Sequence, residues 1–132
     1  MSFETELRAL LTGSAAVTAL VPAARINWSE HPQGAPAPYV VLHLIDNADG
    51  LHLKGRTGLW SGRVQVDCYA ATPAGAIALS APIVTLLHGY VGGGFNPIRF
   101  ASMRGPFVQQ RTGQDDRLFA RQLDFITHWR GT

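Results

Sequence analysis

Residues 62–70 of the chain read Gly62-Arg63-Val64-Gln65-Val66-Asp67-Cys68-Tyr69-Ala70, an alternation of polar and apolar residues. Successive side chains of a β-strand point to opposite faces of its sheet, so this pattern predicts a strand. Its valines, Cys68 and Ala70 share one face, which we expect to be core. Arg63, Gln65 and Asp67 share the other face, which meets water or a partner.

The N-terminal region predicts two helices. Residues 3–11 have apolar side chains at helical spacing, Ser2 can cap the first turn, and Gly13 ends the segment. Ser14 can cap a second, shorter helix, which Pro22 ends. We expect these two helices to cover one face of a sheet.

A third helix is predicted to begin at Thr72 and Pro73 and to end near Gly89, because these residues form an N-cap, a first helical position and a stop. It has two apolar stripes, one with Ile77, Ala81, Val84 and Leu87 and one with Leu79, Ile83 and Leu86. Pro82 lies inside it and removes one backbone hydrogen bond, so we expect a kink or a break there.

The middle of the chain predicts a strand followed by a long loop. Residues 39–45 are apolar on nearly both faces, which favours an interior strand. Residues 46–58 mix glycine with polar residues and show no clear periodicity, so we expect a long functional loop or a mobile connection.

The C-terminal third predicts a hairpin. Residues 98–103 and 106–111 are typical of short strands, residues 112–116 of a turn, and residues 117–130 of a last strand that alternates again. The predicted fold class is therefore α+β: a mainly antiparallel sheet with helices packed on one face, forming one small domain over residues 1–132.

Composition narrows the possible functions. The 14.3 kDa chain has the length of one domain, and its 46% hydrophobic content argues against disorder. The net charge of +2 comes from scattered cations without a run, which argues against a stripe that binds nucleic acid. No apolar run is long enough for a membrane span, and we expect no export signal. With Cys68 as the single cysteine, we expect no disulfide and an inert thiol.

The order and spacing of these elements resemble one family. The shared patterns are the N-terminal helix, the Ala15-Ala16-Val17-Thr18-Ala19-Leu20-Val21 segment, Pro38-Tyr39-Val40-Val41-Leu42, residues 62–70, and Arg121-Gln122-Leu123-Asp124-Phe125 with Trp129. In these the chain resembles the tail completion, or tail terminator, proteins of long-tailed phages, prophages and gene transfer agents. The patterns span almost the whole chain, but they consist of core residues rather than catalytic motifs.

The resemblance implies a structural virion assembly protein that is not an enzyme. Such a subunit forms a homohexameric ring that caps the tail tube and joins it to the head connector or stopper protein. The ring is assembled in the bacterial cytoplasm and lies at the tail–head junction of the virion. DNA passes through its lumen without sequence-specific binding, and no membrane is involved. A related role as a connector adaptor stays open.

We expect the surfaces that bind neighbours and tube on residues 47–58 of the long loop, the 105–116 hairpin and the polar face of the 62–70 strand. The candidate residues on these three segments are Asp49, His52, Lys54, Arg56, Arg63, Gln65, Asp67, Arg111, Asp115 and Asp116.

Catalytic chemistry has weaker support. Asp67 and Asp124 would make an acid–base pair if their strands brought them together; otherwise each pairs with an arginine such as Arg63 or Arg121. The five histidines lack the spacing of metal ligands, so we expect no catalytic residue, metal or cofactor. Two alternatives stay open. An enzyme or small-molecule-binding domain predicts a pocket with convergent ionisable groups, and a nucleic-acid-binding protein predicts a continuous basic patch.

Overall fold

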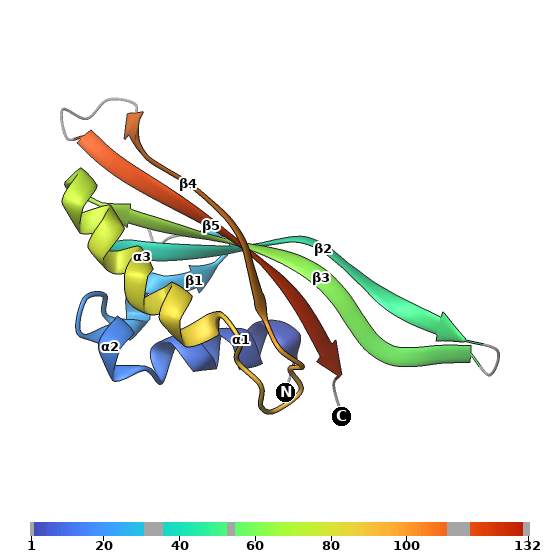
Figure 1. The fold of residues 1–132 in the computed structure, drawn as a ribbon. Helices are drawn as coiled ribbons and strands as arrows, with labels where there is room; N and C mark the ends of the chain where they lie inside the picture. The colour runs from blue at the N-terminus through green and yellow to red at the C-terminus, as the bar shows by residue number, and fades with distance from the viewer. Residues whose placement is uncertain (1, 31–35, 53–54, 111–116, 131–132) are drawn as a thin grey trace.

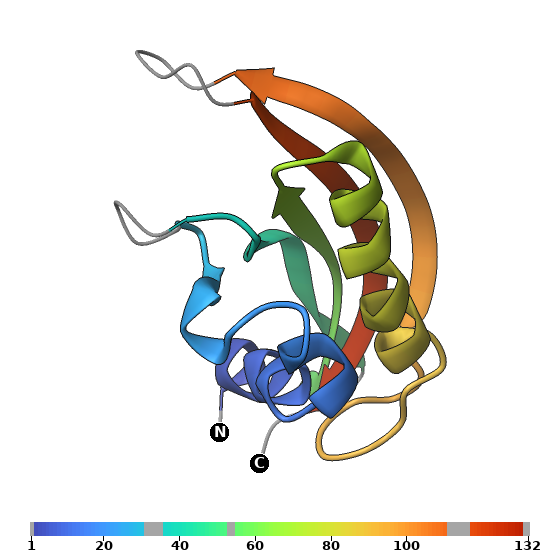
Figure 2. The ribbon, with the colours of Figure 1, turned by 90° about the vertical axis from the view of Figure 1, so that its left-hand side faces the viewer.

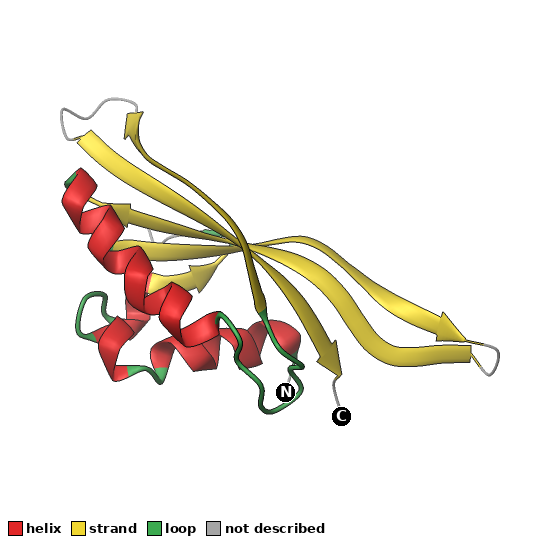
Figure 3. Cartoon of the chain, in the orientation of Figure 1, coloured by secondary structure: helices red, strands yellow, loops and turns green. Residues whose placement is uncertain are grey.

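A computed structural model describes residues 2–30, 36–52, 55–110 and 117–130. This part of the chain contains three α-helices, one 3-10 helix and five strands (Figures 1 and 3). Their bounds are α1 Phe3–Thr12, α2 Ala15–Thr18, η1 Ala23–Arg25, β1 Ile26–Trp28, β2 Tyr39–His52, β3 Gly55–Ala70, α3 Pro73–Leu87, β4 Arg99–Gln110 and β5 Arg117–Arg130.

The strands form one mostly antiparallel sheet in the order β1-β2-β3-β5-β4. The short β1 runs parallel to β2, and every other pair of neighbours is antiparallel. β3 is the central strand, paired with β2 from Gly55 to Tyr69 and with β5 from Leu59 to Ala70. These pairings confirm a small domain with a mainly antiparallel sheet.

The predicted helix caps are confirmed. Ser2 Oγ accepts a hydrogen bond from the Thr5 amide at 3.1 Å, and Thr72 Oγ1 accepts one from the Gly75 amide at 3.0 Å. Ser14 caps α2 in the same way. No helix in the described ranges is long and apolar enough to cross a bilayer.

The buried apolar face predicted for residues 62–70 is confirmed, but Asp67, predicted to lie on the face that meets water or a partner, is buried as well. Val64, Val66 and Cys68 are fully buried, and they join one core cluster with apolar residues from all three α-helices and from β5. Figure 2 shows α3 lying along the curved sheet. Its buried side chains, Ala76, Leu79, Ser80, Ile83 and Leu87, merge the two predicted stripes, whereas Ile77 is 44% exposed.

The prediction of a long loop at residues 46–58 is wrong. β2 continues to His52 and β3 begins at Gly55, so residues 46–52 and 55–58 belong to the two strands of a hairpin that projects from the body (Figure 1). Residues 53–54 lie outside the described residues. Two register irregularities, at Ile45 and Gly50, interrupt the pairing of β2 with β3. They break the two-residue period, which explains why the alternation was invisible in the sequence.

Three other predictions need correction. The two short strands at 98–103 and 106–111 form one strand, β4, with irregularities near Ala101 and Gly105. α3 continues through Pro82 without a break. Leu44 and Ile45, predicted to be interior, are 40% and 54% exposed; they lie beyond the residues of β2 that pair with β1, at an irregularity in the pairing with β3.

Candidate interaction surface

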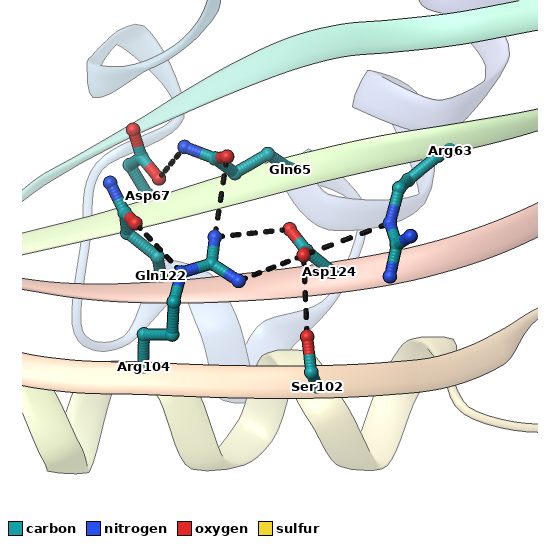
Figure 4. Close-up of polar contacts among 7 residues, drawn as sticks. All are labelled: Arg63, Gln65, Asp67, Ser102, Arg104, Gln122 and Asp124. Atoms are coloured by element: carbon teal, nitrogen blue, oxygen red, sulfur yellow. Dashed lines mark hydrogen bonds and ion pairs between the residues drawn. The ribbon is translucent and has the colours of Figure 1, made fainter.

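A cluster of polar side chains spans three strands on the sheet face away from the main core (Figure 4). β3, β5 and β4 are neighbours in the sheet, and their register brings these side chains together. We call the following residues the polar cluster: Arg63, Gln65, Asp67, Ser102, Arg104, Gln122 and Asp124.

Asp124 is the acceptor at the centre of the polar cluster. Its Oδ2 accepts hydrogen bonds from Arg104 Nη1 at 2.9 Å and Ser102 Oγ at 3.2 Å, and Arg63 Nε lies 3.7 Å from the same oxygen. These donors hold the pKa of the Asp124 carboxyl below its ordinary value of 3.8, with the hydrogen bond from Arg104 as the largest cause. Asp124 is therefore an ionised structural acceptor at neutral pH.

Arg104 connects all three strands of the polar cluster. It donates to Gln122 Oε1 at 3.1 Å and to Gln65 Oε1 at 3.4 Å, in addition to Asp124. Its side chain remains 44% exposed, as does that of Arg63 at 45%. The polar cluster thus has a buried anion below two accessible guanidinium groups, and planar guanidinium groups suit contacts with carboxylates of a partner protein.

Asp67 has a different environment. It is only 3% exposed, and it accepts a hydrogen bond from Gln65 Nε2 at 2.8 Å and a longer one from the Tyr69 hydroxyl at 3.4 Å. His43 Nε2 lies 3.2 Å from Asp67 Oδ2. Burial raises the pKa of the Asp67 carboxyl, and these hydrogen bonds and the charge of His43 only partly oppose it.

The hypothesis of a carboxylate pair is not supported. Asp67 lies opposite Gln122, and Asp124 lies opposite Gln65, so each carboxylate has its own donors. The alternative that Asp124 pairs with Arg63 is confirmed, although its principal partner is Arg104, which the sequence did not single out. Recognising β4 as one continuous strand beside β5 would have pointed to Arg104.

The other predicted interaction residues lie outside the polar cluster. Asp49 is half-buried on β2, opposite Trp60 of β3. His52 and Arg56 lie at the ends of β2 and β3 near the tip of the projecting hairpin, where only the backbone is described. Lys54, Arg111, Asp115 and Asp116 lie outside the described residues.

A pocket at the base of the projecting hairpin is the candidate for the alternative of an enzyme or small-molecule-binding domain. It has a volume of about 450 Å³ and is lined by Ser2, Phe3, Glu4, Leu44, Asn47, Trp60 and Trp129. This lining is mainly apolar and contains one carboxylate, so it lacks the convergent ionisable groups that a catalytic pocket needs. The described residues contain no cluster of potential metal ligands.

Two potential nucleophiles also lack the surroundings that would activate them. Cys68 is fully buried, and burial raises the pKa of its thiol. Ser61 Oγ lies 3.1 Å from His128 Nδ1, but within the described ranges no carboxylate is bound to this histidine.

Comparisons with known proteins identify the family of this chain. The model of the family "Tail completion protein gp17" matches residues 5–129. A chain in a structure of the virion of a native gene transfer agent particle superposes with a TM-score of 0.68 at 21% identity, over 99% of this chain and 100% of that one. A second solved structure gives a TM-score of 0.50 at 16% identity with the same coverage. No curated protein matches.

At such identities the two solved structures show a shared fold, and the family model carries the assignment, because it matches nearly the whole chain. The resemblance seen in the sequence is thereby confirmed. The chain belongs to the tail completion protein gp17 family and is a structural protein of phage-type tails.

Proposed function

We propose that the chain is a tail completion, or tail terminator, subunit that forms a homohexameric ring, caps the tail tube and joins it to the head connector or stopper protein. The match of the family model to residues 5–129 carries this proposal. The ring lies at the tail–head junction, and packaged DNA passes through its lumen without sequence-specific binding.

The surface chemistry supports assembly rather than catalysis. The polar cluster presents two half-exposed arginines held by a buried Asp124, an arrangement that fixes the direction of the guanidinium groups. A rigid, charged sheet face suits a protein interface, because its side chains lose little freedom on binding. In the proposed ring the helices cover the opposite face, and the hairpin ends with Lys54, Arg111, Asp115 and Asp116 contact tube or neighbours.

Deleting the gene in a strain that produces the particles tests the function directly. We expect electron microscopy to show DNA-filled heads without tails, together with tubes of abnormal length, and a plasmid copy to restore complete particles. Normal particles in the deletion strain would refute the proposal.

The sheet face is tested by complementation with Arg63→Glu. Arg25→Glu is the matched control, because it makes the same charge change on η1, outside the polar cluster. Arg63 contacts the buried Asp124, so Arg63→Glu also brings two carboxylates together and has a folding cost that Arg25→Glu lacks. Circular dichroism of both purified variants therefore has to show that each is folded before the yields are compared. We expect Arg63→Glu to reduce the yield of complete particles and Arg25→Glu to leave it unchanged; equal yields would remove this face from the interface.

A further inference from the structure

Two strand edges of the sheet lack a neighbouring strand within the described part of the chain. The β2 edge comprises residues 43–52, on the side of β2 away from β3, because β1 pairs only with residues 40–42. The β4 edge is the side of β4 away from β5. Figure 1 shows β2 and β4 on opposite borders of the sheet.

Exposed apolar side chains concentrate at these two edges. Of the eight large apolar residues that are substantially exposed in the described ranges, five lie on β2 or β4: Leu44, Ile45, Met103, Phe107 and Val108. Long exposed edges with apolar side chains are sites where another chain binds. Burial of these side chains is therefore a reason for the protein to associate.

The two edges carry opposite charges at matching positions. Asp46 on β2 is exposed, Arg99 on β4 is exposed, and neither makes an ion pair or side-chain hydrogen bond with another described residue. In the register of the sheet, Asp46 lies opposite Arg63, Arg63 opposite Ile126, and Ile126 opposite Arg99. Asp46 and Arg99 therefore mark the two ends of one row across the sheet.

Because the row has a carboxylate at one edge and a guanidinium at the other, the β2 edge of one copy is complementary in charge to the β4 edge of another. The four strands between the two edges alternate in direction, so β2 of one copy runs antiparallel to β4 of an adjacent copy that has the same orientation. When such copies stand side by side without a shift along the strands, Asp46 of one meets Arg99 of the next. A contact between two different edges of identical chains is heterologous, and it closes into a ring when the rotation permits.

We propose that the β2 edge of one subunit binds the β4 edge of the next, with Asp46 paired to Arg99 across the contact. The proposal rests on the proposed function only in that the ring needs a contact between subunits. Pro106 and the irregularities of both strands interrupt a continuous backbone ladder, so side chains carry most of the contact.

Charge exchange between two separately purified variants tests this contact. Asp46→Arg places two arginines at each contact, and Arg99→Asp places two aspartates there. When the variants are mixed in equal amounts, alternating subunits restore an opposite pair at every contact. Arg25→Asp serves as the control for the change in net charge that Arg99→Asp makes. The measurement is native mass against concentration up to about 1 mM, the range that includes weak association.

We expect the wild type and the control to assemble into a species of about 86 kDa, six times 14.3 kDa. Each edge variant should need at least about tenfold more protein for half-assembly, and the mixture should assemble like the wild type. Circular dichroism checks that the variants are folded.

Edge variants that assemble like the wild type, or a mixture that does not assemble, would overturn the edge contact. If a hexamer still forms, the proposed function stands and the subunits associate through another surface. A wild type that stays monomeric or stops at dimers would also overturn this contact, whereas the deletion phenotype would still decide the function.

Discussion

Glu6 connects α1 to β5 and to the segment before β4 through two hydrogen bonds. The structure predicts how much unfolding free energy is lost when Glu6 is replaced by glutamine. Glu6 Oε1 accepts a hydrogen bond from the Gly94 amide at 2.6 Å, and Oε2 accepts one from Trp129 Nε1 at 3.0 Å. Trp129 is 8% exposed, so water cannot readily replace the lost acceptor. Glutamine has one acceptor oxygen, so its NH₂ group faces one of the two donors.

The loss is one charge-assisted hydrogen bond and a donor left facing a donor, about 1.5–3 kcal/mol of unfolding free energy. Glu4→Gln is the matched control, because Glu4 also lies in the first turn of α1 and its replacement removes the same charge from the helix N-terminus. That charge contributes about 0.3–1 kcal/mol through the helix dipole. We therefore expect Glu6→Gln to cost at least about 1 kcal/mol more than Glu4→Gln.

Urea unfolding at one fixed protein concentration, followed by circular dichroism, measures both losses. Fixing the concentration matters because association stabilises the folded state by mass action. Equal midpoints for the two variants would show that the Glu6 contacts contribute nothing beyond the charge, and the reasoning would fail.

Three smaller predictions use the same assay. Gly93→Ala should cost about 1–3 kcal/mol more than Gly89→Ala, because both glycines have positive φ but only at Gly93 would a Cβ collide with the Glu6 carboxylate; equal losses would contradict the crowding. The folded pKa of Asp124 is lowered, so its stabilising contribution is present above the unfolded value of about 3.8 and is lost as pH falls. Asp124→Asn should therefore be less stable than wild type at neutral pH, and this difference in unfolding free energy should disappear below about pH 4. A difference that does not change with pH would contradict the prediction. The raised pKa of Asp67 has the opposite sign: wild type should lose stability relative to Asp67→Asn as pH rises from about 4, and a constant difference between pH 3 and 7 would exclude this effect.

Strands and helix starts could be predicted where neighbouring residues in the sequence determine them. The last strand was expected at residues 117–130 and lies at Arg117–Arg130, because its second half alternates, with Leu123, Phe125 and Trp129 buried on one face. In its first half Leu118 and Ala120 are buried on the opposite face, so the alternation does not extend over the whole strand. The caps at Ser2, Ser14 and Thr72 are equally local, since each side chain binds an amide three residues later. Such features need no knowledge of the tertiary structure.

The projecting hairpin had no comparable signal. Beyond the part of β3 that pairs with β5, none of the described residues adds a third strand to the hairpin, so burial does not impose alternation there. Its glycines and polar residues are typical of loops, and propensity alone favours that interpretation. A two-stranded ribbon is only marginally stable by itself in water, which favours a role in which a neighbour covers it.

The polar cluster and the proposed edge contact depend on register, which a single sequence does not contain. Arg104 reaches Asp124 because two irregularities in β4 set which residues of β4 and β5 lie opposite each other. The same register places Asp46 and Arg99 at the two ends of one row, although each looks like an ordinary surface charge in the sequence. A shift of one strand by one residue would move its side chains to the other face and remove both relationships. Interaction sites of this kind follow from strand pairing, and an account of this protein's assembly has to begin from the sheet rather than from a sequence motif.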